Sequence, residues 1–484
     1  MIRNFIRFGV LTLVLGYLVS CSREEIEPDI MPPDEEEIPL KFPKKEMRGV
    51  WMATVWGLDW PQGMYDEESQ KELYIDYLDL FQSLNINTIF FQVKGMGDAF
   101  YDSPFEPWSQ NITGSRGQDP GYDVLEFLIS EAHARHMQFH AWLNPYRIAT
   151  RAGAGTAYPE LHPSVDPDWV VSHEKIQIYN PAVPEVRQRL VDIVKDLITI
   201  YDVDGVHFDD YFYPSPTAAG QMVSDQGDYE EYGQNYPSIE DFRRANVDKA
   251  IERVYEAIVE TRPEVVFSIS PAPSHDYNYG TLFADVRKWC QEGWVDLVIP
   301  QLYQEIGNPY NDFQNNLNWW SQYHYEAALM VGHGFYKFGD ANSPAAFQST
   351  RELADQFAMT RRNDKVVGNV LYSAQYLPLN RIGITDRLAD LYQQPTLNPP
   401  LGRSVLDVPA GPTDVRVEGD KLKWSASGDL RSVVYYFADL EEEGVLFTLT
   451  DQNEWPLAGS GTYCVSTVNG EYTESERVCR KVNR

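Results

Sequence analysis

Eight apolar runs alternate with amphipathic segments between residues 46 and 394, and this alternation constrains the fold more than any other feature of the chain. Several runs are almost continuously apolar, as strands are in a parallel sheet that is buried on both faces. The predicted strands are residues 49–55, 88–93, 138–143, 205–209, 265–270, 297–302, 327–332 and 366–372. Apolar residues at helical spacing predict helices at 73–84, 186–201 and 247–258, and further helices near 123–136, 281–292, 312–324, 345–361 and 384–393.

This order of elements predicts an α/β fold, a (β/α)8 or TIM barrel over residues 46–400. An open, doubly wound sheet is the structural alternative. It usually carries a glycine-rich cofactor fingerprint, which is not visible in this sequence. After Pro399 and Pro400 the pattern changes to short strands at 414–417, 421–424, 433–437, 445–449, 462–468 and 477–481. This pattern predicts that residues 410–484 form a small β-sandwich similar to a fibronectin type III domain.

The first 45 residues have the character of an export signal and a tether. Arg3 and Arg7 precede an apolar run that ends in Leu18-Val19-Ser20-Cys21. Residues 1–20 resemble a signal peptide that ends in a bacterial lipobox, in which Cys21 receives the lipid. Residues 21–45 are rich in Glu, Asp and Pro, and such a stretch buries too little apolar surface to fold. We expect a flexible acidic linker and a protein anchored in the outer membrane by lipid, at the periplasmic face or the cell surface.

Charge and cysteine content restrict the partners. The formal net charge of −32 argues against nucleic acid, whose phosphates an acidic protein repels. The lipid chains on Cys21 are then the expected membrane contact. Cys290 lies in a helical pattern and is expected to be a buried thiol, whereas Cys464 and Cys479 flank a predicted hairpin where an exported chain permits a disulfide. No Cys/His cluster has zinc-ligand spacing and no phosphate-binding glycine loop is visible, so we predict neither metal nor cofactor.

Carboxyl groups lie at and beyond the C-terminal ends of the predicted strands, which is where a barrel carries its active-site residues. Asp209 and Asp210 end the fourth strand, and alternation along a strand would send only one of them into the barrel mouth. Glu305 follows the sixth strand and could lie across the mouth, while Asp98, Glu106 and Asp276 are rival loop carboxylates. Glycoside hydrolysis requires one carboxyl group to protonate the leaving oxygen and another to attack the sugar or activate water. We therefore predict Asp209 and Glu305 as the catalytic pair, with Asp210 as a further candidate.

The fourth strand also carries a recognisable spacing. Asp204-Gly205-x-x-x-Asp209 resembles the corresponding signature of barrel glycosidases such as the α-amylases and chitinases. The chitinase pattern adds a Glu two residues further on, where this chain has Tyr211, so the chitinase type of substrate-assisted mechanism is not predicted. His207 shares the strand face of Asp209, and either touches substrate or is a satisfied histidine of the barrel interior.

Other polar and aromatic side chains at the strand ends are predicted to bind substrate, because aromatic faces stack on sugar rings and polar groups bond hydroxyls. For each aromatic residue alone, packing in the core is the alternative. The predicted set is Trp56, Lys94, Asp98, Trp142, Asn144, Tyr146, Arg147, His207, Tyr211, Tyr303, His333 and Tyr336. Residues 214–237 form a long segment without a clear period, which predicts a lid over the site.

Together these segments resemble one family, the bacterial glycosyl-hydrolase-like ten family. The matching stretches are Glu46-Met47-Arg48-Gly49-Val50-Trp51, Asn87-Thr88-Ile89-Phe90-Phe91-Gln92-Val93, Glu106-Pro107-Trp108-Ser109, His140-Ala141-Trp142-Leu143-Asn144-Pro145-Tyr146-Arg147, Asp204 to Pro214, Gly293-Trp294-Val295-Asp296 and Pro300-Gln301-Leu302-Tyr303. The family is regarded as barrel glycosidases, and one lipoprotein member is thought to cleave peptidoglycan glycan strands stripped of their peptides. The resemblance implies a glycosidase for such denuded strands here.

Two other functions compete with this hypothesis. The chain could be a glycosidase for dietary or host polysaccharide, or a non-catalytic lipoprotein that binds glycan through its aromatic residues. A binding protein would need no carboxyl pair. The sequence leaves the sugar, the linkage, the anomeric outcome and the oligomeric state open.

Overall fold

The computed structural model of the chain describes residues 40–483, apart from 154–155, 402–407 and 429. The predicted signal peptide with Arg3 and Arg7, the lipidation site Cys21 and most of the predicted linker lie outside the described residues. Residues 40–45 differ from the expected linker. Lys41 pairs with Glu443 as a parallel bridge, and the Phe42 ring packs on Tyr435 and Phe437 of the C-terminal domain.

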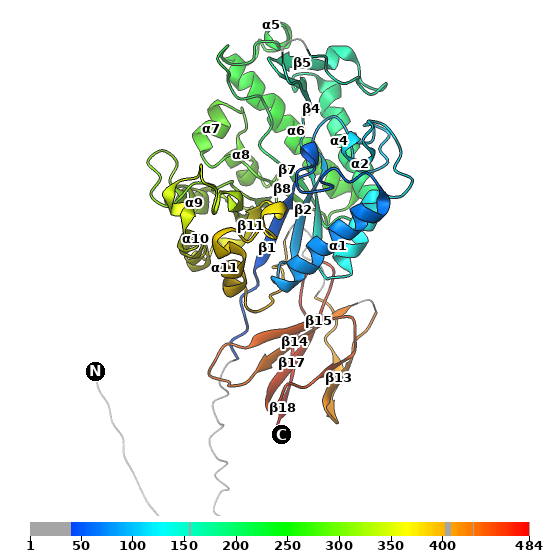
Figure 1. Cartoon of the computed structure of the whole chain (residues 1–484), viewed down its shortest axis with the longest axis vertical. Helices are drawn as coiled ribbons and strands as arrows, with labels where there is room; N and C mark the ends of the chain where they lie inside the picture. Colours follow the sequence, from blue (N-terminus) through cyan, green and yellow to red (C-terminus); the bar gives the residue numbers. More distant parts are fainter. Residues whose placement is uncertain (1–39, 154–155, 402–407, 429, 484) are drawn as a thin grey trace, which may run out of the picture. The chain divides into compact units, whose positions relative to one another are not determined.

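Eight parallel strands close into a barrel, which confirms the predicted architecture (Figure 1). The order around the barrel is β1-β11-β10-β9-β8-β7-β3-β2. The strands are β1 (Met47–Met52), β2 (Thr88–Lys94), β3 (Gln138–Leu143), β7 (Gly205–Phe208), β8 (Val266–Ile269), β9 (Leu297–Val298), β10 (Ala328–His333) and β11 (Val366–Tyr372). All eight correspond to the predicted apolar runs.

Helices surround the barrel strands in Figure 1. They are α1 (Glu67–Ser83), α2 (Gln110–Thr113), α3 (Val124–His133), α4 (Pro184–Ile200), α5 (Gln226–Tyr232), α6 (Ile239–Thr261), α7 (His275–Gly280), α8 (Val286–Gln291), α9 (Phe313–Tyr323), α10 (Arg351–Arg362) and α11 (Ile384–Leu391). Short 3-10 turns lie at η1 (Val55–Gly57), η2 (Pro167–Trp169), η3 (Phe335–Lys337), η4 (Ala345–Gln348), η5 (Ala374–Tyr376) and η6 (Arg381–Gly383).

Three local features differ from the predicted elements. Strand β9 stops at Val298, not at residue 302, and Pro300 just beyond it has no amide hydrogen to give to a ladder. A small antiparallel sheet of order β4-β6-β5 follows β3, from β4 (Arg147–Thr150), β5 (Val170–His173) and β6 (Ile176–Tyr179). Its four-residue strands are only partly buried, so they leave no clear apolar run. The predicted lid segment 214–237 contains helix α5.

The barrel interior is filled with side chains. One buried cluster joins inward-facing residues of seven strands, and its largest members are Trp51, Phe90, Trp142 and Met330. A separate and larger cluster fills the layer between the strands and the helices. The barrel interior is therefore a packed core, and a site open to ligand must lie at one end of the barrel.

The Asp204-Gly205 part of the sequence signature has a structural role at the start of β7. Asp204 Oδ2 accepts hydrogen bonds from Phe139 N at 2.7 Å and contacts His133 Nε2 at 2.8 Å, so it ties β3 and α3 to β7. At Gly205 an added Cβ would lie 2.2 Å from Nδ1 of the fully buried His140 ring. Glycine is needed there because the His140 ring of the neighbouring strand β3 occupies the space that a side chain would take.

The C-terminal domain has seven strands in two antiparallel sheets, one more strand than predicted. One sheet has the order β12-β13-β16, from β12 (Thr413–Glu418), β13 (Lys421–Ser425) and β16 (Glu454–Pro456). The other has the order β15-β14-β17-β18, from β14 (Arg431–Phe437), β15 (Val445–Thr450), β17 (Gly461–Val468) and β18 (Val478–Val482). A single apolar cluster that includes Val415, Trp424 and Tyr463 joins side chains of both sheets.

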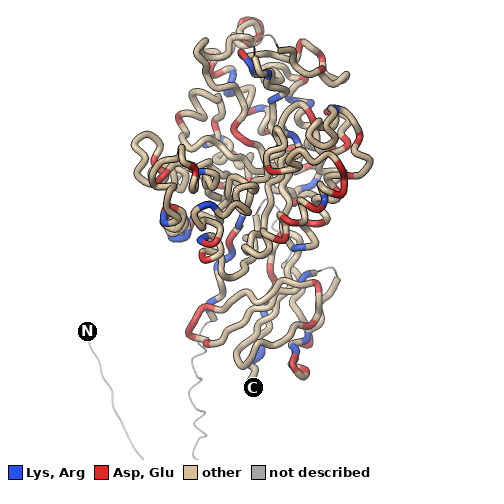
Figure 2. The backbone as a smooth tube through the Cα atoms, in the orientation of Figure 1, with Lys and Arg blue, Asp and Glu red and all other residues tan. Residues whose placement is uncertain are grey.

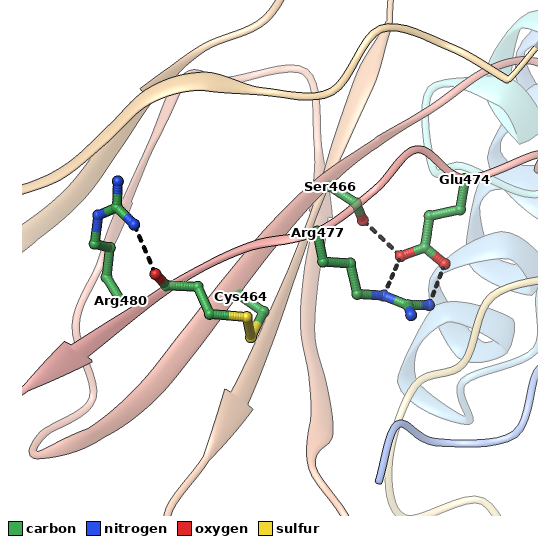
Figure 3. Close-up of a disulfide and its surroundings, with 6 residues drawn as sticks. Cys464, Ser466, Glu474, Arg477 and Arg480 are labelled. Carbon is green, nitrogen blue, oxygen red and sulfur yellow. Dashed lines mark hydrogen bonds and ion pairs between the residues drawn. A yellow bond between two sulfur atoms is a disulfide. The ribbon is translucent and has the colours of Figure 1, made fainter. Parts of the chain in front are cut away.

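A disulfide links the neighbouring strands β17 and β18. It joins Cys464 and Cys479, which face each other in the register of the two strands (Figure 3). Nearby, Glu474 accepts hydrogen bonds from Ser466 and Arg477 (Figure 3). Cys290 is a buried free thiol in α8, as predicted.

Acidic and basic residues are interspersed along both the barrel and the C-terminal strands (Figure 2). Within the described ranges, no helix is long and apolar enough to cross a membrane. The same residues contain no group of three or more His, Cys, Asp and Glu side chains arranged to hold a metal ion.

We expect Gly205→Ala to lower the free energy of unfolding by about 1–3 kcal/mol, because the new methyl group must displace the enclosed His140 ring. Thermal unfolding of the chain without its first 39 residues measures this effect. Gly227→Ala in α5 is the matched control, since its Cβ would meet open space. An equal loss of stability in both variants would contradict the steric explanation.

Candidate active site

A cavity of about 170 Å³ opens at the C-terminal ends of the barrel strands. Aromatic and polar side chains make up most of its wall, and two carboxyl groups enter it. The lining residues are Trp51, Val55, Trp56, Leu58, Gln92, Gly95, Trp142, Asn144, Arg147, Asp209, Asp210, Tyr211, Ser270, Gln301, Tyr303 and Tyr372. The structure thus brings eight of the predicted site residues together.

Asp209 lies at the floor of this cavity and is only 2% exposed. Its Oδ2 accepts a hydrogen bond from Trp142 Nε1 at 3.0 Å, and its Oδ1 accepts one from Tyr211 N at 3.4 Å. The carboxyl group is held at this place because β3 and β7 are neighbours, with Trp142 in register with His207. Burial, and next the charge of Asp210, raise the pKa of Asp209 to about 7.

Asp210 also lines the cavity, contrary to the expectation that only one of the pair would do so. The alternation argument fails because β7 ends at Phe208, so both carboxylates belong to the loop that follows the strand. Burial raises the pKa of Asp210 to about 6, although a hydrogen bond from the Gln301 side chain opposes the shift. Because the pKa of Asp209 is the higher of the two, the pair holds one proton, on Asp209, between about pH 6 and pH 7.

Arg147 supplies the positive charge of the site. Its guanidinium carbon lies 3.7 Å from the centre of the Tyr211 ring, a close cation–π contact. The same charge lowers the pKa of both Asp209 and Asp210 and so limits the effect of their burial. Arg147 is the first residue of β4, and its backbone N–H donates to Asn144 Oδ1 at 3.0 Å.

Trp56 projects from the turn that follows β1 and is 67% exposed. Its φ of 57° places it in the left-handed region, which is uncommon for a bulky residue and is found where surrounding contacts fix the backbone. Gln92 Oε1 accepts hydrogen bonds from Thr54 N and Val55 N at 3.0 and 2.9 Å, and these bonds hold the turn. The exposed indole is therefore presented by a rigid support.

A second cavity of about 130 Å³ lies beside the first. The two share Val55, Trp56 and Gly95 in their walls, so the Trp56 side chain stands between them. Asp98 lines the second cavity and forms an ion pair with Arg116 at 3.7 Å. The prediction that Asp98 touches ligand thus concerns this neighbouring cavity.

Several predicted site residues are packed inside the fold and do not line the first cavity. His207 is fully buried, accepts from Trp51 Nε1 at 3.1 Å and contacts Ser268 Oγ at 2.8 Å. Its pKa is lowered by burial, so it is the interior histidine of the two alternatives. Lys94 and His333 are fully buried among polar partners. Tyr146 is part of the apolar core. Tyr336 packs edge-on against Tyr303 and does not line the cavity.

Glu305 is not among the residues that line either of these two cavities. Its Oε1 accepts a hydrogen bond from Asn308 Nδ2 at 3.0 Å, while Oε2 is buried and bonds to none of the described residues. The charge of Glu305 acts on Lys337 and partly offsets the lowering of the Lys337 pKa by burial. The predicted pair of Asp209 and Glu305 is therefore not assembled in one cavity, and Asp209 and Asp210 are the carboxyl groups that are.

The prediction missed other lining residues, among them Gln92, Ser270, Gln301 and Tyr372. Ser270, Gln301 and Tyr372 lie at or next to the ends of predicted strands, and this position could have marked them as site residues. Tyr372 stacks on Tyr303 with ring centres 5.7 Å apart and closes the aromatic wall opposite β7.

Comparison with known proteins identifies the family. The model of the glycosyl hydrolase-like 10 family matches residues 46–349. Glycosyl hydrolase YngK of Bacillus subtilis (strain 168) is 35% identical over 428 residues, which are 83% of this chain and 83% of that protein. Glycosyl hydrolase DigH of Escherichia coli (strain K12) is 32% identical over 414 residues, which are 77% of this chain and 93% of that protein.

The chain is also similar to solved structures at low sequence identity. The glycoside hydrolase domain of PgaB (BpsB) from Bordetella bronchiseptica has a TM-score of 0.47 and 12% identity, and the match covers 71% of this chain and 98% of that one. The family assignment therefore rests on sequence, and the family model covers the segments that place Asp209, Asp210 and Trp56 in the cavity. The chain belongs to the glycosyl hydrolase-like 10 family.

Proposed function

We propose that this protein is an O-glycosyl hydrolase that cleaves the glycan strands of peptidoglycan after their peptides have been removed. The observation that carries the proposal is the pair of carboxyl groups, Asp209 and Asp210, in one cavity at the C-terminal face of a barrel. Membership of the glycosyl hydrolase-like 10 family supports the reaction class, and the family resemblance described above suggests the substrate.

The state of the two carboxyl groups suits the chemistry. A glycosidase needs a protonated acid for the leaving oxygen beside an ionised carboxylate, and pKa values near neutrality allow both forms to coexist. Asp210 titrates near 6 and Asp209 near 7, so between these values Asp209 carries the proton while Asp210 is ionised. A protein that only bound glycan would have no need to bury two adjacent acids, since burial of charge costs free energy.

The shape of the site supports a polymeric substrate. A chain that lies across the exposed Trp56 would place one sugar in each of the two adjacent cavities. Indole faces bind sugar rings through apolar contact while the hydroxyls stay solvated. A single small glycoside would leave the second cavity unused.

The C-terminal domain is proposed to be a fibronectin type III-like module that spaces the enzyme or binds glycan. Its three-stranded and four-stranded sheets support this, as does Tyr463 near the start of β17. The Tyr463 hydroxyl bonds back to the backbone of Ala458 and Gly459, as the tyrosine of such sandwiches does.

The direct test of the proposed function is incubation of the chain without its first 21 residues with peptide-free peptidoglycan glycans, followed by mass spectrometry. We expect shorter glycan fragments from the native protein. Asp209→Asn, which cannot donate a carboxyl proton, should lower the rate by about 10²–10⁴-fold. Fragments from a panel of dietary or host polysaccharides, with none from peptidoglycan, would replace the proposed substrate; binding without any cleavage would leave only the glycan-binding alternative.

The rate of cleavage should follow a bell-shaped pH profile with its maximum between about 6 and 7, set by Asp210 on the acidic side and Asp209 on the alkaline side. The Trp142 N–H stabilises the Asp209 carboxylate, so its loss in Trp142→Phe raises the pKa of Asp209 and moves the alkaline limb to higher pH. A limb at the same pH in both proteins would show that Asp209 does not control it.

Trp56→Ala should weaken binding of long glycan strands more than it slows bond cleavage, because the indole stands between the cavity of the carboxyl pair and the neighbouring cavity, where sugar units beyond the scissile bond would bind. We expect KM to rise about 5- to 160-fold, which corresponds to roughly 1–3 kcal/mol for one lost stacking contact. The comparison of kcat and KM on strands of increasing length measures this. A fall in kcat alone, with KM unchanged, would contradict a binding role.

We further propose that the protein is a lipoprotein of the outer membrane, anchored at Cys21. The lipobox-like sequence supports this, and the disulfide between Cys464 and Cys479 fits an oxidising compartment outside the cytoplasm. Cys21→Ser should move the protein from the membrane fraction to the soluble fraction and abolish incorporation of labelled fatty acid. Retention of label in the variant would show that lipid is attached elsewhere.

A further inference from the structure

The two carboxyl groups of the active site reach its cavity from the same place in the barrel. Asp209 and Asp210 are consecutive residues directly after β7, and among the described residues they are the only acids that line the cavity. In most glycosidases the two carboxyl groups flank the scissile bond, with the nucleophile or base across the sugar from the proton donor. Two consecutive residues at one strand end do not flank the bond in this way.

Within the part of the chain that the structure describes, the wall opposite β7 holds no carboxylate. The strand order places β11 and β1 across the barrel from β7, and from these two strands and the turns after them the cavity receives Trp51, Val55, Trp56, Leu58 and Tyr372. A tyrosine can attack a sugar only as its phenolate. Burial raises the pKa of Tyr372 and of its neighbour Tyr303, so both hydroxyls stay protonated and are poor nucleophiles.

Other nearby acids are engaged elsewhere. Asp59 is fully buried and accepts hydrogen bonds from Ala53 N, Ser373 Oγ and Gln375 N, which tie the β1 turn to the segment after β11. Asp98 faces the neighbouring cavity and pairs with Arg116. With Glu305 outside the lining as well, none of the acids around the cavity supplies a nucleophile from the opposite wall.

We infer that the nucleophile is supplied by the substrate itself, as the 2-acetamido group of an N-acetylhexosamine unit in β linkage, with Asp209 as the proton donor and Asp210 as the partner of the acetamido N–H. The inference rests on the proposed function and extends it to the reacting sugar. It differs from the chitinase arrangement excluded by Tyr211, because here the two acids are adjacent in sequence.

The steps balance within the site. Asp209 gives its proton to the glycosidic oxygen as the C1–O bond breaks, and the acetamido carbonyl oxygen bonds to C1. The amide N–H proton passes to Asp210, which leaves a neutral oxazoline ring on the sugar. Water then attacks C1 and gives a proton to Asp209, while the bond from C1 to the acetamido oxygen breaks and Asp210 returns its proton to nitrogen. Both acids recover their initial states, and the β configuration is retained.

The surroundings fit this division of work. Trp142 Nε1 and Tyr211 N orient the Asp209 carboxyl group by hydrogen bonds. Gln301 and Arg147 favour the ionised form of Asp210, which the acetamido N–H requires as acceptor. The cavity of about 170 Å³ is bounded by rings of Trp51, Tyr303 and Tyr372, an apolar enclosure that suits the acetamido methyl group.

The test compares substrates that differ only in the acetamido group. The probes are an aryl β-glycoside of an N-acetylglucosamine oligosaccharide, its mono-, di- and trifluoroacetyl analogues, and peptide-free glycan strands before and after N-deacetylation. Fluorine withdraws electrons from the carbonyl oxygen with little change in size, so turnover should fall at each step and be lost with trifluoroacetyl. Deacetylated strands should not be cleaved, and NMR should detect the β-anomer as the first product.

Two variants separate the roles of the acids. An aryl group leaves without a proton, so Asp209→Asn should still release it in the first turnover while it loses cleavage of glycan strands. Asp210→Asn should lose both, because the acetamido group is no longer held. Unchanged melting temperatures would show that both variants fold, and an equal loss of both reactions in Asp209→Asn would overturn its role as proton donor.

The outcomes distinguish this inference from the proposed function. Cleavage of deacetylated strands, insensitivity to fluorine, an α-anomer as first product or a sugar covalently bound to the protein would each overturn substrate assistance while a glycosidase remains. Cleavage of the aryl oligosaccharide with the expected fluorine dependence, but no fragments from peptidoglycan strands, would overturn the proposed substrate and uphold the inference. Failure to cleave any N-acetylated probe would overturn both.

Discussion

The parallel closure of the barrel is the constraint on which the site depends. Because all eight strands run in the same direction around a closed ring, residues that follow β1, β3, β7 and β9 meet at one end of the molecule. The interior below them is filled by Trp51, Phe90 and their neighbours, so that end is a shallow cavity over a solid floor. Each lining side chain belongs to a barrel strand or to the six residues that follow it, so no long loop is required to bring these side chains together.

This solid floor also explains the electrostatics. Asp209 is hydrogen-bonded to the Trp142 indole, which packs edge-on against His207, and is almost fully buried. The same burial that destabilises its carboxylate keeps its proton available near neutral pH. Arg147 offsets part of this cost for the pair. The burial that costs free energy at these adjacent acids thus also sets the protonation states that a glycosidase uses.

The sequence predicts the barrel well because each strand is an apolar run between more polar loops. It also predicts site residues that lie within a few positions of a strand end. Asp209 and Asp210 follow β7 directly and Tyr303 lies five residues beyond β9, and all three line the cavity. Glu305 lies seven residues beyond the end of β9, and by that distance the direction of the chain is decided by contacts such as the bond from Asn308.

Other errors have similar physical causes. The sheet of β4, β5 and β6 was not predicted because its four-residue strands are half exposed and follow no strict alternation. Fully buried polar groups such as His207 and His333 resemble ligand-binding groups in sequence, since only the structure reveals the Ser268 and Asn369 partners that satisfy them.

The same small sheet has a consequence for how the enzyme can diversify. Arg147 is both the residue whose charge acts on the two acids and the first residue of β4, which pairs with Ile178 of β6. The sheet is an insertion between β3 and α4, and none of its strands belongs to the barrel. Changes in the length or sequence of this insertion can therefore move the Arg147 charge relative to the two acids while the eight barrel strands keep their pairing.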